Sequence, residues 1–314
     1  MKKLLLLSAI ILLTSCDPGE IPHYPIIDNK VPTTPTASPT PTDPTIPTDP
    51  MLPEWTDMPD QNFEKALIKQ GYDDVVDGKV LTSNISGINK IYLEHANIEN
   101  TKGIENFISL EFLSFWDNPF TSIDVSHNVK LKIFGISECP VSTIDLSKNI
   151  ELEEIAFQHN TVGVNDPNYP FGRTVGLTSL DLSHNVKLKR IYLMMNRLKS
   201  LDVSMLPELT DLWLGNSDAN EPTNVGNKIK TIDISKNFRL DNIHVSDLGL
   251  MDLNIKNTPN NGIPRRFTVN HNPDLLEIKV KSIEAIKKAL WKAPTYWWNN
   301  TTYWVIDSWV KYIE

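Results

Sequence analysis

The sequence predicts an α/β solenoid, in which short repeats stack into a curved parallel β-sheet with short turns or 3-10 segments on the convex side. Two observations predict it. An apolar frame, L-x-x-L-x-L-x-x-N-x-L, recurs through the middle of the chain and is clearest at residues 188–198. A second frame, an aspartate between apolar residues, alternates with the first. Repeats of this kind bury their apolar positions between neighbours, so the stack presents an extended surface.

The first frame is the leucine-rich repeat signature. Positions 1, 4 and 6 should point inward and the residues between them outward, because side chains alternate along a strand. The asparagine at position 9 should satisfy backbone groups at a buried turn; Ala96, Ser217 and Leu248 replace it and should interrupt the ladder. The frames begin at Ile88, Leu110, Leu131, Leu152, Leu188, Leu209, Leu240 and Leu275.

Residues 1–16 have the pattern of a secretory signal peptide. Lys2 and Lys3 precede an apolar run that is too short to span a bilayer, and the run ends in L-T-S-C. This tetrapeptide resembles the bacterial lipobox, which implies a lipidated Cys16; an ordinary signal peptide with an incidental cysteine is the alternative. Two acyl chains suffice for stable anchoring. We therefore expect a lipid anchor in the bacterial cell envelope, at the outer membrane, on either its periplasmic or its surface face.

Residues 17–54 form a linker rich in proline and threonine, which should be extended and should act as a stalk. Residues 55–87 are expected to form a helical N-terminal cap. Within this cap, residues 73–84 look like a decayed EF-hand loop. Val75 and Asn84 stand where two ligands are needed, so a plain turn is favoured and no metal is assigned.

Residues 88–281 contain the repeats and the candidate binding surface. Reading positions 5 and 7 along the copies places Tyr192, Trp213 and Met194 side by side, with His244 at their border. Such an exposed aromatic patch suits a binding hot spot, and a flat aromatic platform would equally suit a sugar ring. The alternative is chance surface aromatics, or cover by an inserted loop. Trp116 and Phe112, or the C-terminal tryptophans, are the next candidates.

The second frame recurs six times, and the serine or asparagine two places after each aspartate should cap a convex turn. A ladder of cation sites is disfavoured, because no second carboxylate accompanies each aspartate. The register of the repeats breaks after Asn160 and after Asn216, and loops leaving a strand end often carry binding residues. The aspartates are Asp124, Asp145, Asp181, Asp202, Asp233 and Asp252.

Residues 282–314 should cap the open end of the solenoid, with a glycan-binding tail as the alternative. Ser282 should begin an amphipathic helix, followed by a strand pair around Asn299 and Asn300. This segment holds five of the eight tryptophans of the chain, namely Trp291, Trp297, Trp298, Trp304 and Trp309.

The alternation of the two frames over residues 58–281 resembles the leucine-rich repeat lipoproteins of Bacteroidetes, which are distant relatives of the internalins. The resemblance implies extracellular or envelope binding of a protein or glycan, because members carry different partners on one scaffold. The formal net charge of −9 disfavours nucleic acid as a partner. No catalytic motif or cofactor signature was found, so an enzyme is not expected. A structural envelope lipoprotein without a ligand is the main alternative, and a glycan-active enzyme is the third.

Overall fold

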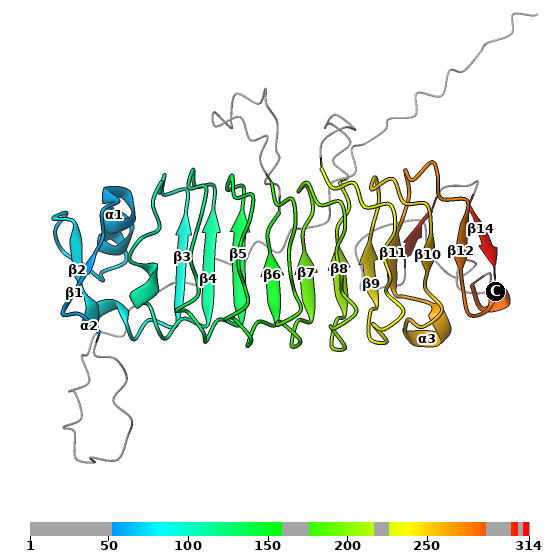
Figure 1. Cartoon of the computed structure of the whole chain (residues 1–314), viewed down its shortest axis with the longest axis horizontal. Coiled ribbons are helices and arrows are strands. Elements are labelled where there is room, and N and C mark those ends of the chain that lie inside the picture. The colour runs from blue at the N-terminus through cyan, green and yellow to red at the C-terminus, as the bar shows by residue number, and fades with distance from the viewer. Residues whose placement is uncertain (1–51, 159–175, 217–225, 287–302, 307–309, 314) are drawn as a thin grey trace, which may run out of the picture.

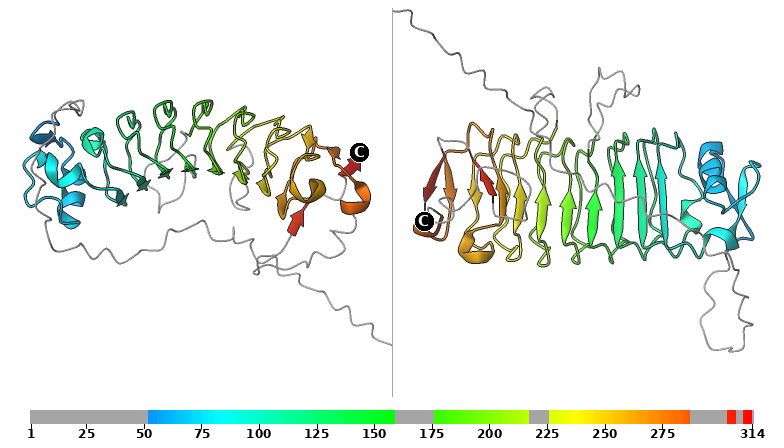
Figure 2. Two further views of the ribbon diagram at one scale, coloured as in Figure 1. Left: turned by 90° about the horizontal axis from the view of Figure 1, so that it is seen from below. Right: turned by 180° about the vertical axis from the view of Figure 1, so that it is seen from behind.

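The computed structural model describes residues 52–158, 176–216, 226–286, 303–306 and 310–313. They form a leucine-rich repeat solenoid with a sheet of nine parallel strands, which confirms the predicted fold. The strands stand side by side along the molecule and line one side of a curved stack, with turns on the other side (Figures 1 and 2). They are β3 (Lys90–Glu94), β4 (Phe112–Trp116), β5 (Ile133–Ser137), β6 (Glu154–Ala156), β7 (Arg190–Tyr192), β8 (Asp211–Trp213), β9 (Asn242–His244), β11 (Arg266–Thr268) and β13 (Tyr303–Val305).

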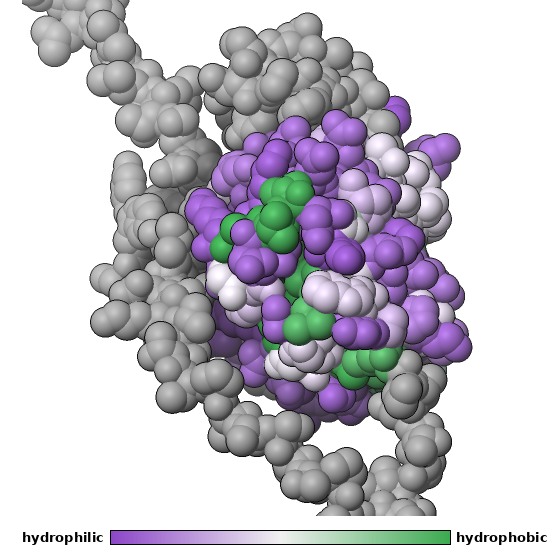
Figure 3. Space-filling model, turned by 90° about the vertical axis from the view of Figure 1, so that its left-hand side faces the viewer, coloured by the Kyte–Doolittle hydropathy of each residue, from purple (hydrophilic) through white to green (hydrophobic). Residues whose placement is uncertain are grey.

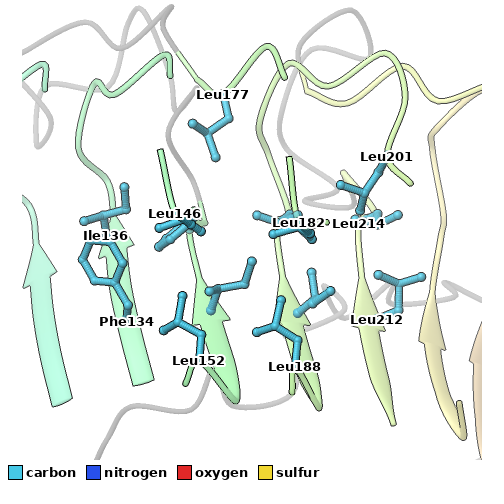
Figure 4. Packing of buried hydrophobic residues seen from close by; sticks show 14 of the residues in the cluster. Phe134, Ile136, Leu146, Leu152, Leu177, Leu182, Leu188, Leu201, Leu212 and Leu214 are labelled. Carbon is cyan, nitrogen blue, oxygen red and sulfur yellow. The ribbon is translucent and has the colours of Figure 1, made fainter. Parts of the chain in front are cut away.

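The core runs along the solenoid between the sheet and the turns. Leu188, Ile191 and Leu193, at positions 1, 4 and 6 of one copy, are each 0% exposed. Side chains of successive copies and of the second frame, such as Leu214 and Leu182, lie in one buried cluster (Figure 4). Burying an aliphatic side chain of this size contributes ~1.5–3 kcal/mol. The inward positions predicted from the apolar frame are therefore confirmed.

A left-handed residue at position 8 follows six of the strands, and after β4 it directs the position-9 asparagine inward. Asn118 donates to the carbonyls of Leu93 and Trp116 at 2.6 and 3.0 Å and accepts from the Ile98 amide at 3.0 Å. These bonds satisfy backbone groups of two neighbouring copies, as predicted. The residues at position 8 with a φ between 48° and 59° are His95, Asp117, Glu138, Met195, Asp247 and His271.

The ladder continues after Asn216, where an interruption was expected. Asn227 donates to the carbonyls of Leu193 and Leu214, both at 2.8 Å, and accepts from the Leu198 amide at 3.0 Å. It takes the position that Ser217 would hold if the copy had no insertion. Ser217 and Asn160 themselves lie outside the described residues.

The second frame closes the convex turns in a way that differs from the prediction. The aspartate side chain accepts a hydrogen bond from the backbone amide of the serine two places later, at 2.8–2.9 Å in five copies. The aspartate is therefore the cap in these five copies, and the serine hydroxyl is not. This bond also lowers the pKa of Asp124. In the sixth copy Asn254 is the cap, as predicted, because its side-chain oxygen accepts from the Lys256 amide at 3.1 Å. A second asparagine ladder, not foreseen, follows in the same turns and consists of the fully buried Asn128, Asn149, Asn185 and Asn237.

The copy assigned to Leu275 does not belong to the nine-stranded sheet. The strand beside β9 is β11, and a frame that starts at Pro264 places Phe267 and Val269, both 0% exposed, at positions 4 and 6. The segment after Leu275 forms β12 (Glu277–Lys279), which lies between β10 (Leu253–Asn254) and β14 (Lys311–Ile313) in a separate parallel sheet. This segment matches the apolar frame because Ile278 is buried in its own sheet, as the position-4 residue of a repeat would be. The short helix α3 (Pro259–Gly262) leads into β11.

The N-terminal cap contains β1 (Trp55–Asp57), α1 (Gln61–Lys69), β2 (Lys79–Leu81) and α2 (Thr82–Ile85). The 3-10 turn η1 (Ile104–Asn106) lies between β3 and β4, in the first repeat. Glu64 is fully buried, and its carboxylate accepts from the amides of Asp77, Gly78 and Lys79 at 2.9, 2.8 and 3.2 Å. Amides pointing at a carboxylate are the reverse of a calcium loop, in which oxygens point inward. The outer end of the cap is mostly hydrophilic (Figure 3), as a terminal repeat requires.

At the C-terminal end, the Ser282 hydroxyl accepts from the Ala285 amide at 3.2 Å, as expected of a helix cap. The first strand of the pair predicted around Asn299 and Asn300 lies outside the described residues, so the structure describes only its second strand, β13. β13 pairs in parallel with β11, whereas β14 pairs in parallel with β12, so each strand extends a different sheet. Asn299, Asn300, Trp291, Trp297, Trp298 and Trp309 lie outside the described residues. No helix among the described residues is long and apolar enough to span a membrane.

Candidate functional site on the concave face

The outward positions of the nine-stranded sheet form columns, because the strands pair without a shift in register. At position 5, large side chains flank three consecutive small ones, and strands lie ~4.8 Å apart. The small residues of β4, β5 and β6 therefore separate two groups of aromatic side chains. From β3 to β11 the column reads Tyr92, Ser114, Gly135, Ala156, Tyr192, Trp213, His244 and Thr268.

Tyr192, Trp213 and His244 make one group, the β7–β9 cluster. The Tyr192 and Trp213 rings lie 5.6 Å apart at an interplanar angle of 72°, and the Trp213 and His244 rings lie 5.7 Å apart at 51°. Edge-to-face contacts of this kind stabilise a cluster beyond simple burial. The predicted juxtaposition of these three residues is therefore present.

The exposure and shape of the cluster differ from the sequence-based expectation. Tyr192 and Met194 are each only 8% exposed, whereas Trp213 and His244 are half-buried. The rings are also strongly tilted relative to one another, so they do not form a flat platform. The concave face thus offers part of one indole ring and part of one imidazole at this point.

Packing around His244 fixes its ring and its charge. The Nδ1 atom shares a hydrogen bond with the Thr268 hydroxyl. On the other side, a Cβ atom on Gly215 would lie 2.4 Å from Nε2 of His244, so only glycine leaves room for this ring position. Burial lowers the pKa of His244 to about 4. The imidazole is therefore neutral at pH 7.

Position 3 adds a polar row beside the cluster. Arg190 forms an ion pair with Glu154 on the neighbouring strand. The Asp211 carboxylate accepts from Asn242 Nδ2 and from Thr210 Oγ1, both at 2.6 Å. Sequence reasoning used positions 5 and 7 and missed this row. The same alternation would have found it, since position 3 also points outward.

Burial also raises the pKa of Tyr192, and the negative charges of Asp211 and Glu154 act in the same direction. The phenol therefore keeps its proton over the whole physiological range. With His244 neutral as well, the cluster presents uncharged aromatic surface next to a strip of fixed charges.

The remaining candidates, Trp116 and Phe112, lie in a second aromatic group at β3 and β4. The rings of Tyr92 and Phe112 are 4.8 Å apart, and those of His95 and Trp116 are 4.9 Å apart. The Lys90 ammonium lies 4.8 and 4.7 Å from the Tyr92 and Phe112 ring centres. Phe112 is 8% exposed, so this group is consolidated by its own packing.

The described residues contain no group of three or more histidine, cysteine or acidic side chains placed to hold a metal ion. Cys139 is buried at position 9 of its copy, where its thiol donates to the Ser137 carbonyl at 3.4 Å. A buried thiol bonded to a backbone carbonyl in this way has a structural role. The lipidation candidate Cys16 lies outside the described residues.

The chain matches no protein family and no curated protein. Among solved structures it is similar to internalin C2 of Listeria monocytogenes, with 13% identity over 80% of this chain and 98% of that one, and a TM-score of 0.49. The functional domain of InlJ from the same organism has 18% identity over 72% of this chain, and a TM-score of 0.40; the match spans 56% of that domain. The Leptospira interrogans protein LIC12759 has 15% identity, covering 69% of this chain and 74% of that one, with a TM-score of 0.34. These similarities concern the fold alone.

Proposed function

We propose that this protein is an extracytoplasmic binding protein, held on a membrane by a lipid on Cys16, whose concave face binds a segment of another protein. The observation that carries this proposal is the β7–β9 cluster, where a half-buried Trp213 is held between Tyr192 and His244. Tryptophan dominates binding hot spots because it buries a large area with few rotatable bonds. Its neighbours are already fixed, so little entropy is lost when a partner docks.

The tilt of the rings favours a protein over a glycan. A sugar ring stacks best on an open aromatic face, and the angles of 72° and 51° leave an uneven surface. An apolar side chain can fill such a surface. The adjoining row of Glu154, Arg190 and Asp211 offers both charges and hydrogen-bond acceptors to a peptide.

The proposal is tested by capture with two matched variants. Full-length protein, its Trp213→Ala variant and its Met205→Ala variant would be immobilised and exposed to envelope proteins of the producing cells, and then to a glycan array. Met205 is 57% exposed and lies outside the concave columns, so its loss should change nothing. We expect one protein to bind the wild type and the Met205 variant but not the Trp213 variant. Trp213-dependent capture of a glycan alone would assign the surface to sugars, and capture that is insensitive to Trp213 would reject the site.

A further inference from the structure

The strands of the nine-stranded sheet begin along one edge of the stack, the edge that carries α2 and α3 (Figure 1). Equivalent turns cross this edge, each closed by a hydrogen bond of 3.0–3.3 Å from the amide of frame position 1 to the carbonyl three residues earlier. The turn before the Ile88 copy has Ser86 as its second residue, whereas the second residue is apolar in the six consecutive turns from the Leu110 copy to the Leu240 copy. These six residues form the edge row: Ile108 is half-buried, and the exposed members are Val129, Ile150, Val186, Pro207 and Phe238.

Local structure does not explain the edge row. The second position of a common β-turn accepts most residues, including proline, so the turn itself does not select aliphatic or aromatic side chains. Val129, Ile150, Val186 and Phe238 are 47%, 51%, 43% and 61% exposed. Apolar residues scattered singly on a surface need no explanation, but a continuous row marks an interaction surface.

The neighbouring residues indicate what covers the row. The third residue of each turn alternates in charge after the first copy. Third residues of neighbouring turns form ion pairs within the chain: Glu151 with Lys187 at 2.6 Å, and Glu208 with Arg239. A partner of uniform charge, such as an anionic membrane or a nucleic acid, would meet a like charge at every second turn. A partner with the same alternation at the same spacing would not. In order, the third residues are Ser109, Lys130, Glu151, Lys187, Glu208 and Arg239.

We propose that the edge row is a self-association surface that binds a second copy of this chain in antiparallel orientation. If all six turns overlap about a two-fold axis, Lys130 faces Glu208 and Glu151 faces Lys187 of the second copy. Arg239 then faces the uncharged Ser109. The same overlap sets Ile150 against Val186 and Phe238 against Ile108, so the arrangement satisfies charge and apolar contact together. Such an interface uses the same patch on both copies and closes without forming fibres.

The size of the surface predicts a weak dimer. Six turns at ~4.8 Å span roughly 25 Å, so the row and its flanking charges fall short of the ~800 Å² per partner of a standard interface. Affinity should come from the apolar contacts, while the charges set orientation, because exposed ion pairs contribute little.

Sedimentation velocity of the full chain between about 1 and about 100 µM tests the proposal. We expect a monomer–dimer equilibrium in the wild type. In Phe238→Ser and Val186→Ser the dissociation constant of the dimer should rise at least ~10-fold. The control is Met205→Ser, which removes an equally exposed apolar side chain off the row and should leave the equilibrium unchanged. Lys187→Glu should also weaken the dimer, and adding Glu151→Lys should restore it. A wild type that stays monomeric, or an association that the row variants do not change, would overturn the proposal.

Discussion

At the scale of single residues, the concave face depends on side chains that are held in place by their neighbours. Trp213 has Tyr192 at one ring edge and His244 on the other side, and His244 is itself held by Thr268. Gly215 contributes by having no side chain, since any Cβ there would displace the imidazole. Three of these residues come from neighbouring strands, so the arrangement exists only when the repeats are stacked in register.

The lowered pKa of His244 makes stability depend on pH. In the unfolded chain a histidine titrates near ~6.5, whereas burial lowers the pKa of folded His244 to about 4. Between these values the unfolded state binds more protons, so the stabilisation by the neutral ring is complete above ~6.5 and is lost as the pH falls towards 4. We expect the free energy of unfolding to fall by ~1–3 kcal/mol more between pH 7 and pH 4.5 in the wild type than in His244→Gln. Urea denaturation at both pH values measures this difference. The control is His127→Gln, at an exposed histidine, which should lose as much stability as the wild type over this pH range. If His244→Gln lost as much as the wild type too, the pH dependence would not come from His244.

Gly215 and Gly135 provide a matched pair of substitutions on the same face. Gly215→Ala must displace the His244 ring and should destabilise the domain by ~1–3 kcal/mol, as overpacking does. At Gly135 the nearest atom to an added Cβ is Ser114 Oγ at 3.6 Å, an ordinary contact, so Gly135→Ala should be nearly neutral. Thermal unfolding of both variants decides the matter, and equal melting temperatures would show that His244 is free to move.

At the scale of the element, each strand divides its side chains between core and surface. Ile191→Ala and Leu193→Ala should each cost ~2–5 kcal/mol, because both side chains are 0% exposed in the core shared by neighbouring repeats. Tyr192→Ala, on the outward face but only 8% exposed, should cost less than either. Met205→Ala is the exposed control and should stay within ~0.5 kcal/mol of the wild type. Chemical denaturation gives all four values, and an Ile191→Ala protein as stable as the Met205→Ala protein would mean that the two faces are reversed.

The sequence predicted the repeating elements better than their exceptions. The frame at Leu188 identified the inward residues and the contact of Tyr192 with Trp213, because alternation along a strand and spacing between strands are nearly invariant. The frame at Leu275 was misleading, because any buried strand in a stack repeats apolar residues at the same spacing. The copy that forms β11 was missed because it has Pro264 at position 1, where the frame expects leucine. Exposure also could not be predicted: alternation along the strand places Tyr192 and Met194 on the outward face, and yet each is only 8% exposed.

At the scale of the whole molecule, a sheet of nine parallel strands is closed at one end by the N-terminal cap and extended at the other by β13. The edge row and the concave columns lie on different surfaces of this stack. Binding of a partner on the concave face and pairing of two copies along the edge are therefore compatible. Two copies joined in this way would present two concave faces.

The proposed anchor gives a prediction at the same scale. Cys16→Ser should release the protein from membranes, because the Pro/Thr-rich linker of residues 17–54 has no apolar run to hold it. Fractionation of cells after a high-salt wash measures the membrane-bound share. If the serine variant sediments with the membranes as the wild type does, the lipoprotein assignment is wrong.

If the β7–β9 cluster is the binding surface, Trp213→Ala should lower the affinity for the captured partner. Isothermal titration calorimetry would compare the wild type, Trp213→Ala and Met205→Ala, with melting temperatures measured in parallel. We expect Trp213→Ala to lose about 2 kcal/mol or more of binding free energy, as a hot-spot tryptophan does, while its melting temperature changes little and Met205→Ala binds as the wild type does. Unchanged affinity together with a lowered melting temperature would mean that Trp213 serves only the packing of the solenoid, and that the partner binds elsewhere.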